Sequence, residues 1–357
     1  MLYAASFAQG ASVGYSQAAL NYVKAISTAT NNLSLIPLGG VVNWSMAPWW
    51  AEGLGDYFGQ AESDKKATII HLPPDQITKS PYYPESKRFG LTTFETSRLP
   101  KWICEDLDKL DGLIVPSQFN KDCLIESGVA TDITVIPHAI GDWWWRQDYP
   151  TTDKEAEYVF GYIGAFNSRK NPEALLEAFT KAYPEEQDKV ALLIKTVGPA
   201  SLDTYVKSNY GDRADIWFFN ETFSEEQMLW VYSLIDCYVS AHKSEGFGLG
   251  LLQAAAMGIP VAYTNYSAPK EFLDPAHGHI PMPYTLETVQ NVDTSVSIHF
   301  KDFKNDLEWA TPDVNRFVEL FKDFRGSKSD VVSRDVRARH NWQTVGKAFT
   351  RLYDTIL

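Results

Sequence analysis

The feature that most constrains the fold of this chain is a repeated alternation of short apolar runs with segments of helical periodicity. The apolar runs are rich in β-branched and aromatic residues, as in strands that are buried on both faces of a sheet. Predicted strands in the first half are Leu2–Ser6, Ser34–Leu38, Ala67–Leu72, Gly90–Phe94, Gly112–Val115 and Ile133–Ile136. Those in the second half are Tyr158–Ile163, Val190–Lys195, Ile216–Phe219, Cys237–Ser240 and Ile259–Tyr263. Because the runs alternate with helices twice along the chain, we predict an α/β protein with two parallel sheets.

The length of 357 residues favours two domains. Residues 137–153 lie between the two sets of strands and contain turn formers, charges and three consecutive tryptophans without periodicity, so a linker is predicted there. The expected parts are a first domain over residues 1–145, a second over 146–325, and C-terminal helices over 326–357, the last of them crossing back to the first domain. Three helix starts are marked by Ser117, by Asn171 with Pro172, and by Ser224 with Gln227.

Composition limits the partners and the location of the protein. The 32 basic and 45 acidic residues give a net charge of −13, which repels polyanions and makes nucleic acid a disfavoured partner. A basic stretch in the first half keeps DNA open as a minority option: Lys65, Lys66, Lys79, Lys87, Arg88, Arg98 and Lys101. There is no basic leader or long apolar stretch, and three cysteines lie far apart. We therefore expect a cytoplasmic protein without a membrane span.

The most informative segment runs from Ser244 to Val261. It is predicted to form the end of a strand, a glycine turn and a helix that leads into the next strand. Glycines at 246 and 248 let the backbone approach a ligand closely, and the helix N-terminus after them offers free N–H groups. Such a turn suits an anionic or polyhydroxylated ligand. A tight turn that needs glycine for packing alone is the alternative.

This segment resembles the signature of the retaining glycosyltransferase family 4, whose GT-B fold has two facing Rossmann-like domains with a donor and acceptor cleft between them. The matching residues are Glu245, Gly246, Phe247, Gly248, Gly258, Pro260 and Val261. By this resemblance Glu245 would hold hydroxyls of the transferred sugar, and the residues up to Leu249 would line the donor pocket. Gln253 stands where the family usually has a second Glu that meets the nucleotide ribose. Since an amide also donates, either the ribose contact is remodelled or the donor nucleotide is unusual.

A second block, residues 161–179, resembles the first strand, loop and helix of the family's donor domain. Arg169 and Lys170 come just before the Asn171 cap, so two cations and a helix N-terminus are predicted to meet. A diphosphate leaving group needs such a site because negative charge builds on it as the glycosidic bond breaks. The family's Arg commonly lies nearer Ala165, which makes Lys170 the firmer match. A solvated pair at a helix start is the alternative.

The first half carries further resemblance to one branch of the family, in residues 93–102, 115–120 and 136–140. Glu95 falls near a strand end where many relatives place a His that contacts the donor sugar, so it is the candidate for a polar residue at the reacting centre. A surface pair with Arg98 is the alternative. Gly10, Ser12 and Gly14 resemble the family's glycine loop over the donor phosphates.

Other candidates have competing structural explanations. His71 ends a buried strand and could contact sugar or acceptor, although a lone His there is more often a satisfied core residue. Trp49 and Trp50 could stack on sugar rings, with core packing at least as probable. Asp106 and Asp108 match the metal-binding motif of the other glycosyltransferase fold. They are two residues apart on a predicted helix, so their side chains lie on different helix faces and a shared metal is not expected.

The resemblance implies a retaining, metal-independent hexosyl- or pentosyltransferase that uses a nucleotide-diphosphate sugar and needs no cofactor. The expected reacting residues are Glu95, Arg169, Lys170 and Glu245. A glycan or lipid-linked hydroxyl is the default acceptor, and a modified DNA base is the minority one. Two alternative hypotheses are that the protein is a sugar-nucleotide epimerase or an inactive sugar-nucleotide-binding protein on the same fold.

Overall fold

The computed structural model describes residues 1–7, 14–38, 48–58, 66–80, 86–145, 154–289 and 307–356. The chain divides into two compact units, which are treated separately below. Unit 1 comprises Met1–Asp142 and Arg337–Leu357, and unit 2 comprises Trp143–Val336. Gly10 and Ser12 of the predicted glycine loop lie outside the described residues.

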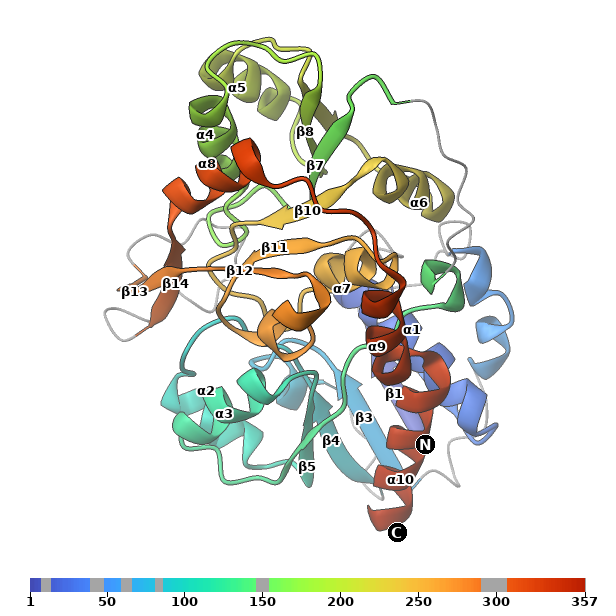
Figure 1. Ribbon diagram of the computed structural model, residues 1–357. Coiled ribbons are helices and arrows are strands. Elements are labelled where there is room, and N and C mark those ends of the chain that lie inside the picture. Colours follow the sequence, from blue (N-terminus) through green and yellow to red (C-terminus); the bar gives the residue numbers. More distant parts are fainter. Residues whose placement is uncertain are drawn as a thin grey trace. The chain divides into compact units, whose positions relative to one another are not determined.

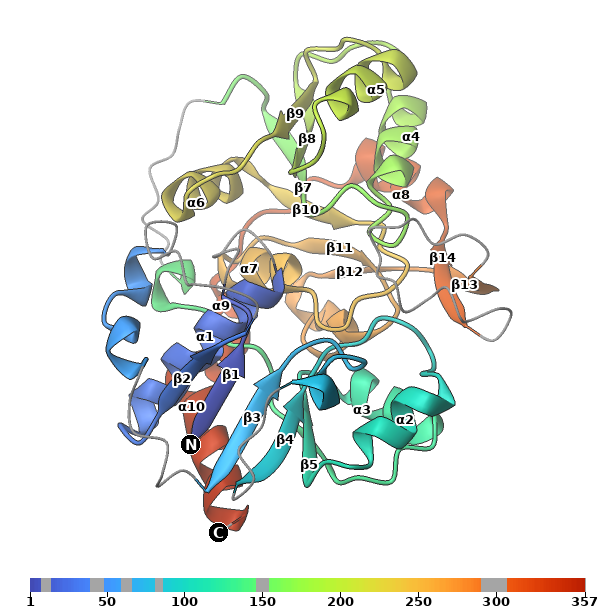
Figure 2. The same cartoon turned by 180° about the vertical axis from the view of Figure 1, so that it is seen from behind.

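Unit 1 is built on a six-stranded sheet with the order β2-β1-β3-β4-β5-β6, in which every pair of neighbours is parallel. Figure 2 shows β1, β3, β4 and β5 side by side. The strands are β1 (Leu2–Ala5), β2 (Ser34–Pro37), β3 (Ala67–His71), β4 (Lys87–Leu91), β5 (Gly112–Val115) and β6 (Ile133–Val135). The helices are α1 (Gly14–Ala29), α2 (Lys101–Leu107), α3 (Gln118–Glu126) and α10 (Trp342–Ile356), with short 3-10 turns at Trp49–Ala51, Leu54–Tyr57 and Ile77–Lys79.

The C-terminal helix α10 packs along α1 in unit 1, as both ribbon views show (Figures 1 and 2). A Cβ atom at Gly346 would lie 2.1 Å from the carbonyl oxygen of Ala25, so glycine is what allows the two backbones to approach. Trp342 donates its indole N–H to Asn21 Oδ1 at 2.9 Å, and the rings of Tyr22 and Phe349 meet edge to face. The last helix is therefore part of the core of unit 1.

Unit 2 has a second parallel sheet, in the order β12-β11-β10-β7-β8-β9. Its strands are β7 (Tyr158–Ile163), β8 (Val190–Thr196), β9 (Ile216–Asn220), β10 (Cys237–Ser240), β11 (Val261–Thr264) and β12 (Ile280–Met282). Its helices are α4 (Pro172–Ala182), α5 (Ser201–Tyr210), α6 (Glu225–Leu234), α7 (Leu249–Ala256) and α8 (Val314–Asp323), with 3-10 turns at Asp142–Trp145, Ala268–Glu271 and Pro275–His277. Helix α9 (Asp330–His340) runs from unit 2 into unit 1.

A separate two-stranded antiparallel sheet, β13 (Tyr284–Thr288) with β14 (Glu308–Pro312), belongs to unit 2 (Figure 1). Neither this sheet nor β12 was predicted from the sequence. Pro281, Pro283 and Pro312 interrupt the apolar pattern there, and the rest of the insertion between β13 and β14 lies largely outside the described residues. No described helix has the length and apolar character that crossing a bilayer requires.

Two predicted strand boundaries are wrong for identifiable reasons. The strand predicted over Gly90–Phe94 is β4, Lys87–Leu91, because side chains of Tyr15 and Asn120 take up the backbone hydrogen bonds of Thr93 and Phe94. The strand predicted from Ile259 begins at Val261, since the Ile259 N–H still bonds to the end of α7 and Pro260 has no N–H to give.

Each sheet has one point where the strand order reverses, and in open α/β sheets ligands bind outside the carboxyl ends of the strands at that point. In unit 2 it lies between β7 and β10, and in unit 1 between β1 and β3. The loop after β7 carries Arg169 and Lys170, and the loop after β10 carries Glu245. Topology therefore brings the candidate donor-site residues together at the carboxyl edge of the unit 2 sheet.

Candidate active site

The turn between β10 and α7 depends on glycine at position 248. Gly248 caps α7 with φ 96°, in the left-handed region that side chains disfavour. A Cβ atom there would also press on Pro269 Cγ at 3.3 Å and Leu251 Cδ1 at 3.1 Å. Glycine thus lets the turn close tightly and directs the first N–H groups of α7 toward the carboxyl edge of the sheet.

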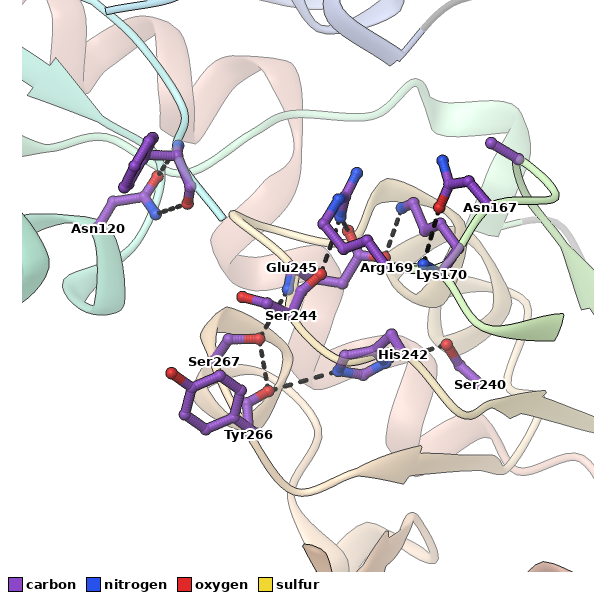
Figure 3. A network of polar contacts seen from close by, with 12 residues as sticks. Asn120, Asn167, Arg169, Lys170, Ser240, His242, Ser244, Glu245, Tyr266 and Ser267 are labelled. Carbon is purple, nitrogen blue, oxygen red and sulfur yellow. Dashed lines mark hydrogen bonds and ion pairs between the residues drawn. The ribbon is translucent and has the colours of Figure 1, made fainter. Parts of the chain in front are cut away.

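Glu245 is held at the centre of this turn and is only 4% exposed. Its backbone N–H donates to Ser267 Oγ at 2.8 Å, and its carbonyl accepts from Ala268 N at 3.3 Å. Its carboxylate accepts from Lys170 Nζ and, at 3.3 Å, from Arg169 Nη1. Figure 3 shows the three charged side chains converging.

The Arg169–Lys170 turn is tied to the β10 loop by its backbone as well. Arg169 Nη1 donates to the carbonyl of Ser244 at 2.8 Å, and the Arg169 carbonyl accepts from Lys243 N at 2.7 Å. Asn171, at φ 54°, donates from its side chain to Ala241 O at 3.1 Å and precedes Pro172 at the start of α4. The two loops therefore form one cross-linked structure.

The charges of this cluster favour an anionic ligand. Burial alone would raise the pKa of Glu245, but Lys170, Arg169 and His242 outweigh it and lower that pKa to about 2. Two cations against one carboxylate leave one net positive charge, beside the N-termini of α4 and α7. A diphosphate group could therefore take over hydrogen bonds that Glu245 now accepts.

His242 and Ser267 complete the network and were not singled out from the sequence. His242 is fully buried between Ser240 Oγ, 3.0 Å from Nδ1, and the Tyr266 carbonyl, 3.4 Å from Nε2 (Figure 3). Burial lowers the pKa of His242 to about 4, so it is neutral at pH 7. Its place just before the signature segment, three residues ahead of Glu245, was the available signal.

Ser267 has a strained backbone, with φ 64° and ψ −157°, a region used almost only by glycine. Its hydroxyl accepts from Glu245 N and donates to the Tyr266 carbonyl at 2.6 Å. Backbone strain of this kind is found mainly where a site requires it. The strained residue is thus the one whose hydroxyl holds the backbone of Glu245.

Gln253 is 5% exposed, and its Oε1 accepts from the hydroxyl of Tyr232 at 3.1 Å. Tyr232 stacks on Tyr238, with ring planes 8° apart, and Trp144 packs edge to face on Tyr232. The side-chain oxygen at position 253 therefore already has a donor. The ribose contact of Gln253 stays a prediction.

The unit 1 candidates have different surroundings. Glu95 is half-buried in an irregular segment after β4. His71 is 1% exposed, bonds through Nδ1 to the Tyr3 hydroxyl at 2.8 Å, and has its pKa lowered to about 3 by burial. Trp50 is buried against Trp342, whereas Trp49 is 56% exposed. Gly14 is the first residue of α1.

Asp106 and Asp108 face different partners, as predicted. Asp106 pairs with Lys109 at 2.5 Å, whereas Asp108 accepts from the backbone N–H groups of Ala130 and Thr131. Both aspartates are thus engaged at the end of α2.

Residues 145–285 match the family model described as glycosyl transferases group 1. One curated relative is the alpha-monoglucosyldiacylglycerol synthase of Streptococcus pneumoniae, 27% identical over 168 residues. That match covers 43% of this chain and 37% of the relative, so the chain matches well under half of the relative's length. The matched family segment contains Arg169, Lys170, Glu245 and Gln253.

Solved structures extend the likeness to the whole chain. A glycosyltransferase from Rickettsia africae is similar with a TM-score of 0.67 at 13% identity, over 99% of this chain and 98% of that one. Anabaena HepE, in complex with UDP and glucose, is similar with a TM-score of 0.66 at 11% identity, over 99% of this chain and 100% of that one. The glycosyltransferase resemblance and the fold predicted from the motifs are confirmed: residues 145–285 are similar to glycosyl transferases group 1, and the chain has the GT-B fold of two Rossmann-like domains.

Proposed function

We propose that this chain is a glycosyltransferase that takes a nucleotide-diphosphate sugar in unit 2 and transfers the sugar, with retention, to a hydroxyl acceptor. The observation that carries the proposal is the meeting of Arg169, Lys170 and Glu245 at the point where the strand order of unit 2 reverses. The family match over residues 145–285 supports the same chemistry.

In this proposal Lys170 and Arg169 bind the diphosphate and stabilise the charge that builds on it as the glycosidic bond breaks. Glu245 then exchanges its cationic partners for hydroxyls of the sugar. Because its pKa is about 2, Glu245 is an anion at neutral pH and can only accept hydrogen bonds. The two side-chain cations supply the positive charge, so we propose a metal-independent reaction without a cofactor.

The donor site is tested by thermal stabilisation with UDP-glucose, UDP-N-acetylglucosamine, GDP-mannose and ADP-glucose. The matching donor at a hundredfold excess over its Kd adds about 2.7 kcal/mol of stability. Glu245→Ala is expected to weaken discrimination between sugars while leaving UDP binding intact. An equal loss of UDP binding would assign Glu245 another role, and no response to any of the four would count against the function.

Retention is tested by proton NMR of the first product formed from an α-linked donor. We expect an α-linked product, because a phosphate oxygen of the leaving diphosphate takes the acceptor proton on the face that the nucleotide leaves, and no side-chain base on the opposite face is then required. A β-linked product would contradict the mechanism and leave the donor site untouched. Release of an isomerised free sugar without acceptor would favour an epimerase, and binding without turnover would favour an inactive sugar-nucleotide-binding protein.

We also propose a cytoplasmic location, supported by three buried cysteines, Cys104, Cys123 and Cys237, that form no disulfide. Fractionation of cells that express the tagged protein checks this.

A further inference from the structure

Lys195 is a buried cation that neither the sequence motifs nor the proposed chemistry explains. It lies in β8, next to the last residue of the strand, and is only 6% exposed. Its Nζ donates to the Thr196 carbonyl at 3.3 Å and lies 5.1 Å from the centre of the Phe223 ring. Among the residues that the structure describes, no carboxylate forms an ion pair with it.

The described residues leave most of the hydrogen-bonding capacity of this ammonium unused. An ammonium has three N–H donors and no acceptor, and the Thr196 carbonyl takes one of the three. Burial lowers the pKa of Lys195, and the charge of Glu221 opposes that effect. A buried charge is unfavourable unless a partner satisfies it. Lys195 is therefore suited to a ligand atom that accepts hydrogen bonds.

Lys195 lies beside the loop that carries Arg169 and Lys170. Its carbonyl accepts from Gly164 N at 3.0 Å, and Gly164 is the first residue after β7. In the sheet register Lys195 lies opposite Ile163, the last residue of β7. In nucleotide-binding α/β folds the phosphates bind at the loop after one strand, and the nucleoside reaches the end of the next. In unit 2 those two strands are β7 and β8.

The side chain of Lys195 lies on the face of the sheet that α6 covers. Side chains alternate between the two faces along a strand. Leu193, two residues before Lys195, packs in a core cluster with Val231 and Leu234 of α6. Phe223, which comes just before the Ser224 cap of α6, packs against the same cluster. Lys195 and Phe223 therefore meet on the α6 face, at the carboxyl edge.

Helix α7 lies on the same face and brings the predicted ribose contact, Gln253, to it. The Tyr232 hydroxyl of α6 is 3.1 Å from two atoms of α7, the Gly250 carbonyl oxygen and Gln253 Oε1. A Cβ atom at Gly250 would lie 3.2 Å from the carbonyl oxygen of Ile163, so the first turn of α7 touches the end of β7. A nucleoside diphosphate held at the N-terminus of α7 can therefore extend across the end of β7 to Lys195.

Resting on the proposed function, we propose that Lys195 selects the nucleobase of the donor by donating a hydrogen bond to a carbonyl oxygen of the base. Uracil and guanine carry a carbonyl oxygen, O4 or O6, where cytosine and adenine carry an amino group. An ammonium can only donate, so it binds the carbonyl and meets the amino group donor to donor. UDP-sugars and GDP-sugars fit this site, whereas CDP-sugars and ADP-sugars do not.

Base selection is measured by isothermal titration within pairs of equal size, UDP against CDP and GDP against ADP. In the pair that binds more tightly, we expect the carbonyl member to have at least about a tenfold lower Kd, as one well-placed contact to a base edge gives. Lys195→Met keeps a long side chain without the donors and should reduce the difference to about threefold or less. Inorganic pyrophosphate should bind the variant unchanged, because its proposed partners are Arg169 and Lys170. An undiminished preference in the folded variant would overturn the inference, as would a parent protein that prefers ADP or CDP.

Two further substitutions separate base selection from a structural role. Lys195→Gln carries an amide that both donates and accepts, so it should bind the two members of a pair about equally. Lys195→Arg keeps a cation that only donates and should retain the preference. If Lys195 were only structural, the Met and Gln variants would lose stability in urea titrations and keep the preference of the parent. That result would also overturn the inference.

Lys189→Met is the matched control. Lys189 directly precedes β8 at its amino end, has a side chain that is 73% exposed, and pairs with Glu157 at 2.7 Å. Its loss should change neither affinity nor preference, and a change as large as in Lys195→Met would contradict the inference. If UDP or GDP binds but Lys195→Met has no effect, the inference fails and the proposed function stands. If no nucleotide binds the parent protein, the proposed function fails and the inference fails with it.

Discussion

Lys170 and Arg169 share one carboxylate, Glu245, and their side chains differ in exposure, at 23% and 12%. Lys170 holds its partner through a compact ammonium, whereas Arg169 also bonds to the carbonyl of Ser244. Arg169 therefore has a second task in holding the loop together. We assign the larger share of leaving-group stabilisation to Lys170.

Lys170→Ala is accordingly expected to lower kcat by about a hundredfold or more, a loss on the order of 3 kcal/mol in transition-state stabilisation. Its fold should survive, because Arg169 still pairs with Glu245. Steady-state kinetics with the matching donor measures the change, and circular dichroism confirms folding. An unchanged kcat in the folded variant would refute the leaving-group role.

Two variants of Ser267 test whether its backbone conformation is strained. Ser267→Ala loses the hydroxyl that accepts from Glu245 N and keeps the unfavourable φ, while Ser267→Gly loses the same bond and relieves the strain. We expect urea titrations to give the glycine variant a free energy of unfolding about 1–3 kcal/mol higher than that of the alanine variant. Both should discriminate poorly between sugars, since Glu245 is then less firmly held. Equal stability of the two would show that the backbone carries no strain there.

At the scale of elements, strands and caps that depend on local pattern could be predicted. Ser117 caps α3, and Ser224 with Gln227 forms the predicted capping box. The cluster of Arg169, Lys170 and Glu245 was predictable because two motifs follow strands that meet at the reversal point. The early end of β4 was not, since it depends on Asn120 and Tyr15, which come from distant segments. The β13–β14 sheet was missed because prolines interrupt its pattern.

A backbone hydrogen bond connects that sheet to the donor site. Ala310 N donates to Lys243 O at 3.0 Å, and Lys243 N donates to the carbonyl of Arg169. Ala310 lies opposite Leu286 in β13, and its N–H points away from that strand toward Lys243. The β14 strand therefore supports the turn that carries the two cations.

Ala310→Pro removes that N–H and should raise the donor KM by about tenfold, since the Arg169–Lys170 turn loses its support. Ala310→Gly keeps the N–H and should leave the donor KM close to that of the parent. Isothermal titration with UDP gives the same comparison without turnover. Matching affinities in the two variants would contradict the support role.

At the scale of the molecule, buried neutral histidines make stability depend on pH. Burial lowers the pKa of His71 to about 3 and of His242 and His279 to about 4, from an ordinary value of 6.5. Above pH 6.5 these side chains are neutral in both the folded and the unfolded chain, so they do not make the free energy of unfolding depend on pH. As the pH falls below 6.5 the unfolded chain takes up protons that the folded chain does not, and stability is lost.

We expect the free energy of unfolding to fall by a few kcal/mol between pH 7.5 and pH 5, on the order of 1–2 kcal/mol for each such histidine. Urea titrations at the two values measure it, and His71→Gln should reduce the difference. Glu245 adds a loss in the same direction only below pH 4.5. A flat profile between pH 7.5 and pH 5 would show that the histidines ionise freely in the folded protein.

The return of α10 to unit 1 determines the order in which the parts can be completed during synthesis. Unit 2 is one continuous stretch, so all its residues have been translated before the last twenty-one residues of the chain, Arg337–Leu357, are made. By then all strands of the unit 1 sheet have been translated, but α10, which packs on α1, has not. The apolar side of α1 that contains Tyr22 therefore stays uncovered until Phe349 has been translated. The nascent chain therefore passes through a stage in which its second unit is ready to fold and its first unit still needs protection from aggregation.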